Sequence, residues 1–341
     1  MSTLSSLLII IFLPTQFYLA GFFLKPGSSV NNPAEKVEGI SDSKPEHPED
    51  PSFKSAISDQ PKNETALGKS GFIPQRKKDF YETKIFASSS VVIDVDSGTI
   101  LHYDKGRTQM PIASLTKMMT AVIVMESIKD LDEPVTIDEE AVSADGTKVG
   151  CPTSVNCVAE RLHLGEKVTA KDLLMAMLLN SANDAAVALG NHIAGSQQAF
   201  ADLMNKKAGE LDLSDSHFCN PSGLDADGCY SSAYDLARIT AYSMKYDLIW
   251  KIMKMQEANM GSCDGKYTHL LKNTDVLLSQ IPNCLGGKTG FTYNAGKSLM
   301  LAASDPNAGK HKVIAVILND NNRWEDMRNL IDWTFDNYEW K

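Results

Sequence analysis

The sequence predicts an α+β domain built on one antiparallel sheet. Segments with a strand pattern stand at both ends of the globular part of the chain, and apolar helical segments lie between them. Terminal strands with helices between them commonly share one antiparallel sheet. The expected strands span residues 88–95, 100–103, 298–303 and 313–318, and the expected helices span residues 114–128, 170–193 and 322–338.

Local sequence signals support these elements in order. Asp96, Ser97 and Gly98 form a turn sequence between residues 88–95 and 100–103, which predicts a hairpin. Residues 114–128 follow Pro111 and are apolar around most of the helix circumference, so this helix should be buried. Apolar runs near the C-terminus predict two core strands, and residues 322–338 predict a closing amphipathic helix.

Composition excludes several classes of protein. The 341 residues include 33 basic and 43 acidic side chains, which give a formal net charge of −10. This acidic balance argues against a nucleic-acid-binding protein, which would carry a basic surface. A hydrophobic content of 43% is ordinary for a globular protein and excludes both a wholly disordered chain and a multi-span membrane protein.

The first 24 residues predict a membrane anchor or a signal peptide. They contain no charged side chain, and residues 4–24 are mostly Leu, Ile and Phe. As a helix, this segment would be about 31 Å long, close to the hydrocarbon thickness of a bilayer. A cleaved signal peptide is the alternative, although a basic region at its start and a clear cleavage site are both missing.

Residues 25–79 predict a disordered tether. Seven of the 14 prolines lie in this stretch, among Ser, Glu, Asp and Lys. Such a composition buries too little apolar surface to offset the entropy lost on ordering. The globular domain is therefore expected over residues 80–341.

Six cysteines lie within the expected domain, and they predict disulfides in an oxidising compartment. The local pairings would be Cys151 with Cys157, Cys219 with Cys229, and Cys263 with Cys284. Because six cysteines allow 15 connectivities, the pairing stays open. A zinc site is not expected, because the chain lacks a C-x-x-C pattern and its histidines are scattered. No metal or other cofactor is predicted.

Three short patterns in the domain predict a catalytic site assembled from distant segments. Copies of these patterns also occur by chance in the expected tether, where no fold could assemble them. The set in the domain comprises Ser114-Leu-Thr-Lys117, Ser181-Ala-Asn183 and Lys288-Thr289-Gly290.

The first pattern supplies a nucleophile and a base. Positions i and i+3 share one face of a helix, so Lys117 can reach the Ser114 hydroxyl. Only about one free lysine in 2,500 is neutral at pH 7, but burial and a second nearby ammonium favour the neutral form. Lys288 is the candidate for that second charge.

These motifs and their surroundings resemble the serine D-alanyl-D-alanine carboxypeptidases, the low-molecular-mass penicillin-binding proteins. The resemblance covers residues from about 85 to the end of the chain. It includes residues 111–120, 218–224, 230–237 and 286–292. It implies a fold similar to β-lactamases and transpeptidases, with an antiparallel sheet flanked by helices and a mostly helical subdomain. No cofactor is implied.

The resemblance also implies roles for the site residues. Ser114 would form the acyl-enzyme, Lys117 would act as its base, and Ser181 would pass a proton to the departing amine. The oxyanion would bind the backbone N–H groups of Ser114 and Phe291, although well-known members often have His at the latter position. The residues expected to bind substrate are Asn183, Lys288, Thr289 and Gly290.

The function implied is removal of the terminal D-alanine from peptidoglycan stem peptides, with inhibition by β-lactams. A D,D-endopeptidase that cuts cross-linked peptidoglycan and a catalytically silent wall-binding scaffold are the alternatives. A β-lactamase is disfavoured. The best-known class of β-lactamases hydrolyses its acyl-enzyme with a Glu that follows the Ser-x-Asn-type motif, whereas Glu166 precedes Ser181. We expect the domain on the outer face of the cytoplasmic membrane, held by residues 4–24, or secreted if the N-terminal segment is cleaved. Nucleic acid is not an expected partner.

Overall fold

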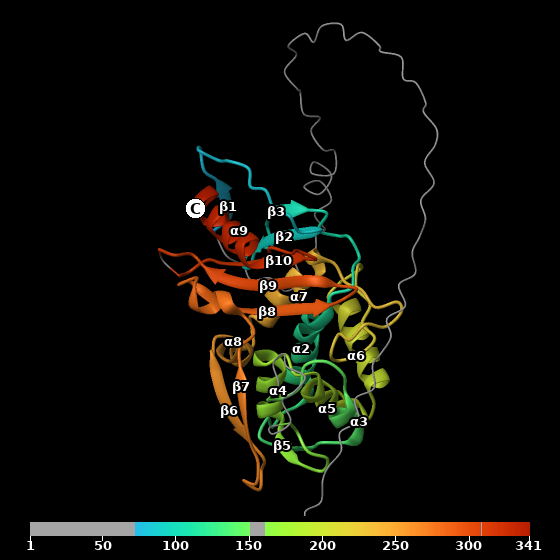
Figure 1. The fold of residues 1–341 in the computed structure, drawn as a ribbon. Helices are drawn as coiled ribbons and strands as arrows, with labels where there is room; N and C mark the ends of the chain where they lie inside the picture. Colours follow the sequence, from blue (N-terminus) through green and yellow to red (C-terminus); the bar gives the residue numbers. More distant parts are fainter. Residues whose placement is uncertain (1–71, 151–160, 308) are drawn as a thin grey trace, which may run out of the picture. The chain divides into compact units, whose positions relative to one another are not determined.

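The computed structural model describes residues 72–150, 161–307 and 309–341 (Figure 1). A five-stranded antiparallel sheet lies at its centre, in the strand order β3-β2-β10-β9-β8. The strands of this sheet are β2 (Ser89–Asp94), β3 (Ile100–Asp104), β8 (Cys284–Thr292), β9 (Gly296–Ser304) and β10 (Lys312–Leu318).

The sheet confirms the predicted fold class and the predicted terminal strands. β2 and β3 form the expected hairpin, with Gly98 in the left-handed region at φ 70° in its turn. β10 lies between β2 and β9, so strands from the two ends of the domain pair directly. β8 occupies one edge of the sheet, which leaves one side of this strand open to other elements.

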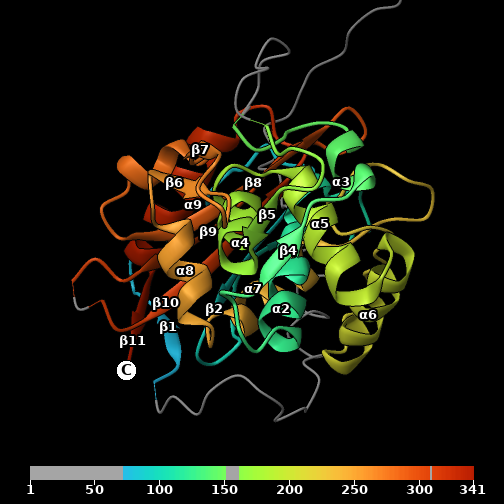
Figure 2. The same ribbon diagram turned by 90° about the horizontal axis from the view of Figure 1, so that it is seen from below.

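Helices cover both faces of the sheet. Alternate residues of β2 point to opposite faces: Val91 and Ile93 belong to one core cluster and Val92 to the other. The C-terminal helix α9 covers one face, and α2, α7 and α8 lie on the other (Figures 1 and 2). The bounds of these helices are α2 (Lys117–Ser127), α7 (Ala233–Ser243), α8 (Asp247–Met253) and α9 (Arg323–Asn337).

A mostly helical subdomain, as predicted, lies on the α2 side of the sheet (Figure 1). Its helices are α3 (Glu139–Ser143), α4 (Ala170–Leu179), α5 (Asn183–Ala194) and α6 (Gln197–Glu210). Two small hairpins accompany them: β4 (Pro134–Thr136) with β5 (Lys167–Thr169), and β6 (Glu257–Gly261) with β7 (Thr268–Lys272). Two short 3-10 helices, η1 (Ala113–Thr116) and η2 (Val276–Ser279), complete the site region.

The prediction of one helix over residues 170–193 is wrong. The structure has α4 and α5, separated by a short break that contains Ser181. Ser181 has φ +59°, a left-handed backbone conformation that a continuous right-handed helix does not contain. The sequence around it has no Gly or Pro to signal the break, so helical periodicity alone could not locate it.

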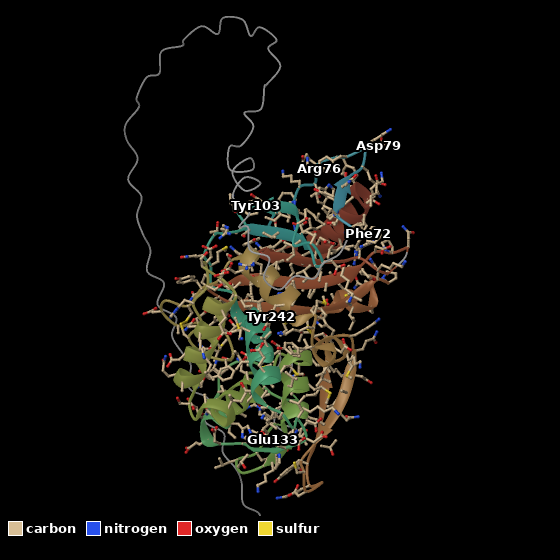
Figure 3. The ribbon with its side chains drawn as sticks, turned by 180° about the vertical axis from the view of Figure 1, so that it is seen from behind. Phe72, Arg76, Asp79, Tyr103, Glu133 and Tyr242 are labelled. Atoms are coloured by element: carbon tan, nitrogen blue, oxygen red, sulfur yellow. A yellow bond between two sulfur atoms is a disulfide. The ribbon has the colours of Figure 1, made fainter. Side chains whose placement is uncertain are left out.

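The C-terminal end of the predicted tether is structured. β1 (Pro74–Arg76) pairs with β11 (Tyr338–Trp340), and the Lys77 N–H donates to the Asn337 carbonyl at 2.8 Å. Figure 3 shows Phe72, Arg76 and Asp79 at the end of the domain opposite Glu133. The folded part therefore begins before residue 80. The rest of the predicted tether lies outside the described residues.

One predicted disulfide is present and another is wrong. Cys219 and Cys229 are bonded, as predicted. Cys263 is exposed at the tip of the β6–β7 hairpin, whereas Cys284 is buried at the start of β8, and both are free thiols. Proximity in sequence was misleading here, because the hairpin carries Cys263 away from the sheet. Cys151 and Cys157 lie outside the described residues.

The predicted anchor, residues 4–24, also lies outside the described residues. Within the ranges that the structure does describe, none of the helices combines the length and apolar character that a membrane span requires.

The contacts of β1 predict where the chain can be shortened without loss of stability. A truncation that starts at residue 72 retains β1, whereas one that starts at residue 80 leaves β11 without its partner strand. We expect the shorter protein to unfold about 5 °C lower, because several backbone hydrogen bonds are lost at roughly 1 kcal/mol each. Thermal unfolding of the two proteins tests this, and equal midpoints would show that β1 contributes no stability.

Candidate active site

The nucleophile candidate, Ser114, lies in η1 directly before α2. Ala113 has φ +48°, and this sharp turn leads from Ile112 into η1. Ser114 is partly exposed, whereas Lys117, the first residue of α2, is fully buried. The Lys117 Nζ lies 3.0 Å from the Ser114 Oγ, which confirms the contact that the i, i+3 spacing predicts.

Lys117 Nζ has two further partners. It donates to the Asn183 Oδ1 at 2.6 Å and to the Ser222 carbonyl oxygen at 2.6 Å. Both of these partner atoms can only accept hydrogen bonds. The three oxygens match the three N–H groups of a protonated lysine. When Lys117 is neutral, its two N–H groups can stay on Asn183 and Ser222 and its lone pair can face Ser114, so its charge is decided by burial and by nearby charges.

The carbonyl of Ser222 is held by a tight loop. Asn220 Oδ1 accepts from the Gly223 N–H at 2.7 Å and from the Ser222 hydroxyl at 3.0 Å. Gly223 has φ +80°, and a Cβ at this position would collide with the Ala113 carbonyl oxygen, so only glycine fits. The Cys219–Cys229 disulfide closes the same loop. The loop therefore packs directly on η1 and fixes an acceptor for Lys117.

The second segment brings Ser181 and Asn183 to the same place. Ser181 lies in the break between α4 and α5, and its Oγ accepts from the Lys288 Nζ at 2.8 Å. Asn183 begins α5, and its Nδ2 donates to the Asp145 carbonyl oxygen at 2.7 Å. The Asn183 side chain therefore orients Lys117 through its oxygen and is itself held through its nitrogen. Its Nδ2 has a second hydrogen available for a ligand.

The third segment lies on edge strand β8. Lys288 is fully buried, and the Thr289 hydroxyl pairs with the Thr274 hydroxyl at 2.8 Å. A Cβ at Gly290 would lie 2.9 Å from the Ile112 carbonyl oxygen, so glycine lets β8 approach η1 closely. Phe291 follows at the exposed side of the strand with 56% of its surface accessible. All three predicted segments are thus brought together in one site.

The charges of the two lysines are coupled. Burial, followed by the nearby Lys288 ammonium, holds the pKa of Lys117 well below its ordinary value. Burial and then the Arg323 guanidinium lower the pKa of Lys288 to about 7, while the Asp275 carboxylate acts in the opposite direction. The site therefore favours a neutral Lys117 and leaves Lys288 able to carry a charge near neutral pH.

Sequence reasoning missed two parts of the site. Arg323, at the start of α9, donates through Nη1 to the Gly290 carbonyl at 3.0 Å and to the Ser298 carbonyl at 3.3 Å. The Ser222 carbonyl is a backbone group, so its residue type gives no signal of its role. Arg323 lies far from the three motifs in the chain, and only the packing of α9 on the sheet brings it to β8.

Two other buried carboxylates have structural partners. Glu166 is buried and accepts from the His163 N–H at 2.9 Å, and its other oxygen lies 2.8 Å from the His269 Nε2. It thus holds the turn that begins at His163 and has no hydrogen bond with Ser114. Asp184 is buried and accepts from the Val149 and Ala185 N–H groups. In the described ranges, no three His, Cys, Asp or Glu side chains are placed to hold a metal ion.

Together, the geometry defines a class of enzyme. A reachable serine hydroxyl beside a buried amine can attack a carbonyl and form an acyl-enzyme. Lys288 and the Thr289 hydroxyl lie on the neighbouring edge strand and can bind an anionic group of a substrate. These are the groups that an active-site-serine peptidase requires.

Comparison with known proteins assigns the family. The family model for D-alanyl-D-alanine carboxypeptidase matches residues 76–322, and the chain belongs to this family. The chain is similar to the D-alanyl-D-alanine carboxypeptidase DacF of Bacillus subtilis, with 32% identity over 79% of this chain and 67% of that protein. A D-alanyl-D-alanine endopeptidase of Escherichia coli is also similar, with 28% identity over 70% of this chain and 73% of that protein.

Solved structures agree with this assignment. The D-alanyl-D-alanine carboxypeptidase of Mycobacterium tuberculosis matches with a TM-score of 0.67 and 30% identity, over 77% of this chain and 96% of that one.

Among the curated relatives, the matched region spans 67% of the Bacillus subtilis protein and 64% of the carboxypeptidase DacD of Escherichia coli. The chain thus covers about two thirds of the length of these carboxypeptidases.

Proposed function

We propose that this chain is a serine D,D-carboxypeptidase that removes the terminal D-alanine from peptidoglycan stem peptides. The observation that carries the proposal is the fully buried Lys117 amine, whose Nζ lies 3.0 Å from the Ser114 Oγ. Burial and the nearby Lys288 ammonium lower the pKa of Lys117, so its neutral amine can take the Ser114 hydroxyl proton. Membership of the D-alanyl-D-alanine carboxypeptidase family supports the choice of substrate.

In the proposed first step, Ser114 Oγ attacks the carbonyl carbon of the penultimate D-alanine while Lys117 takes its proton. The developing oxyanion binds the backbone N–H groups of Ser114 and Phe291, and each such donor is worth about 10²–10³ in rate. The bond to the terminal D-alanine then breaks, and Ser181 passes a proton to the departing amine. Water hydrolyses the resulting ester and restores the serine.

In this proposal, strand β8 recognises the free C-terminus of the substrate peptide. Lys288 and Thr289 would bind the terminal carboxylate of the peptide, Gly290 would let the strand approach it, and Asn183 would hold a substrate amide. A buried ammonium next to a hydroxyl stabilises a carboxylate strongly because water does not screen the interaction. β-Lactams would acylate Ser114 for the same reason, since they carry both a reactive carbonyl and a carboxylate.

The proposal predicts release of D-alanine from a peptide that ends in D-Ala-D-Ala. The Ser114→Ala variant should lose at least about 10³-fold in rate, because the nucleophile is gone. The assay measures free D-alanine, with the Thr116→Ser variant as a matched control, because it alters a neighbouring residue of η1 that is not assigned to the chemistry.

The same assay separates the alternatives. Cleavage of a cross-linked dimer faster than of the pentapeptide would favour a D,D-endopeptidase, as in the Escherichia coli relative. Peptide binding without release of D-alanine from the folded wild-type chain would favour a silent scaffold and contradict the proposal.

We also propose the organisation of the whole chain. Residues 1–24 would form a membrane anchor or a signal peptide, and the tether that follows would end before β1 instead of at residue 79. The catalytic domain would then act on the outer face of the cytoplasmic membrane, where its substrate occurs. After expression in a bacterium, the full-length chain should sediment with the membrane and a chain that starts at residue 72 should not. Equal amounts of both in the soluble fraction would rule out the anchor.

A further inference from the structure

Asp275 is a buried carboxylate that the mechanism above does not use. It precedes η2 and is only 5% exposed. Its Oδ1 accepts from the Leu277 N–H at 2.9 Å and so caps η2, but its Oδ2 is buried and has no hydrogen-bond partner. A carboxylate oxygen left in this way is costly to bury, so its presence calls for an explanation.

The unpartnered oxygen faces the strand that holds Lys288. Thr274, the residue before Asp275, bonds through its hydroxyl to the Thr289 hydroxyl, so this segment lies along β8. A Cβ at Gly287 would meet the Asp275 Oδ2 before any other atom. Because Gly287 has no side chain, the Asp275 carboxylate can lie against the backbone of the residue that precedes Lys288.

The charged and titratable groups around Asp275 come from β8 and α9. Lys288 of β8 and Arg323 of α9 both act on its carboxyl group, whose pKa burial raises to about 6. Cys284 of β8 also lies near it, and burial followed by the Asp275 charge raises the pKa of this thiol to about 12, so the thiol stays neutral. Lys254, which follows α8, also acts on Cys284.

This arrangement places one buried carboxylate near two cations, the fully buried Lys288 and the half-buried Arg323. Lys288 and Arg323 would repel each other without a counter-charge, and Lys288 would relieve the repulsion by losing its proton. With Asp275 ionised, the pocket has one positive charge in excess. A peptide carboxylate that binds to Lys288 would make the group neutral.

We infer that Asp275 is a positioning residue that determines carboxylate recognition, because its negative charge keeps Lys288 protonated in the free enzyme. The inference rests on the proposed function and deepens it, since it names the group that prepares the carboxylate site. It also separates the roles of the two lysines: Lys117 acts without its proton, and Lys288 acts with its proton. Activity then requires a pH above the pKa of Lys117 and below that of Lys288.

The Asp275→Asn variant of the full-length chain tests this inference. Asparagine still accepts from the Leu277 N–H, so the cap of η2 is retained and only the charge is removed. The alkaline limb of kcat/KM for a peptide that ends in D-Ala-D-Ala should move to lower pH by about one unit. On that limb kcat/KM should fall about tenfold, mainly through KM, because carboxylate binding is weakened.

The Asp235→Asn variant is the matched control. Asp235 is also buried, with an unpartnered oxygen, but it lies in α7, where it accepts from the Ser216 hydroxyl and the Asp215 N–H. The alkaline limb of kcat/KM for Asp235→Asn should coincide with that of the wild type. If Asp275→Asn does not fold, Asp275→Ser removes the same charge with a smaller side chain that can still accept from Leu277, and the same shift is expected.

The outcomes distinguish the inference from the proposed function. An alkaline limb that stays at the wild-type pH in a folded Asp275 variant would overturn the inference and leave the carboxypeptidase proposal intact. A wild-type chain that releases no D-alanine at any pH would overturn the proposed function, and the inference with it.

Discussion

The site depends on two lysine side chains buried close enough to affect each other. Lys117 and Lys288 are both fully removed from solvent, and the charge of Lys288 opposes a charge on Lys117. The segment at the start of α5 supplies an acceptor to each amine: Asn183 accepts from Lys117, and Ser181 accepts from Lys288. The Ser222 carbonyl is a further acceptor for Lys117. Three elements hold these amines close together: the sheet edge, the break between α4 and α5, and the disulfide-closed loop. In this arrangement Lys117 favours the neutral form, and Lys288 can carry a charge near neutral pH.

Much of this arrangement could be predicted from the sequence. The terminal strands, the buried helix after Ser114 and the Ser114–Lys117 contact follow from apolar periodicity and from helix geometry, which are local properties. The three motifs predict that the segments of Ser181 and Lys288 meet in one site, and the family resemblance adds the roles of the two residues. The structure places their side chains 2.8 Å apart, across 107 residues of sequence.

Other parts could not be predicted, for physical reasons. The break at Ser181 contains no Gly or Pro, so no local preference indicates it. Its positive φ is held by the surrounding structure. The Ser222 carbonyl is a backbone acceptor, and every residue has one. Arg323 and Asp275 reach β8 through the packing of α9 and of the segment before η2, and neither belongs to a motif. Proximity in sequence favours a Cys263–Cys284 pair, whereas both are free thiols and the β6–β7 hairpin separates them.

The central claim is that Lys117 is a neutral amine when the enzyme works. Nuclear magnetic resonance of the full-length chain with carbon-13 at the lysine Cε positions measures this directly, with the Lys117 signal assigned by its loss in Lys117→Arg. We predict that this signal titrates well below the value of about 10.4 for a free lysine. A Lys117 that keeps its proton up to about pH 10 in the folded chain would contradict the account.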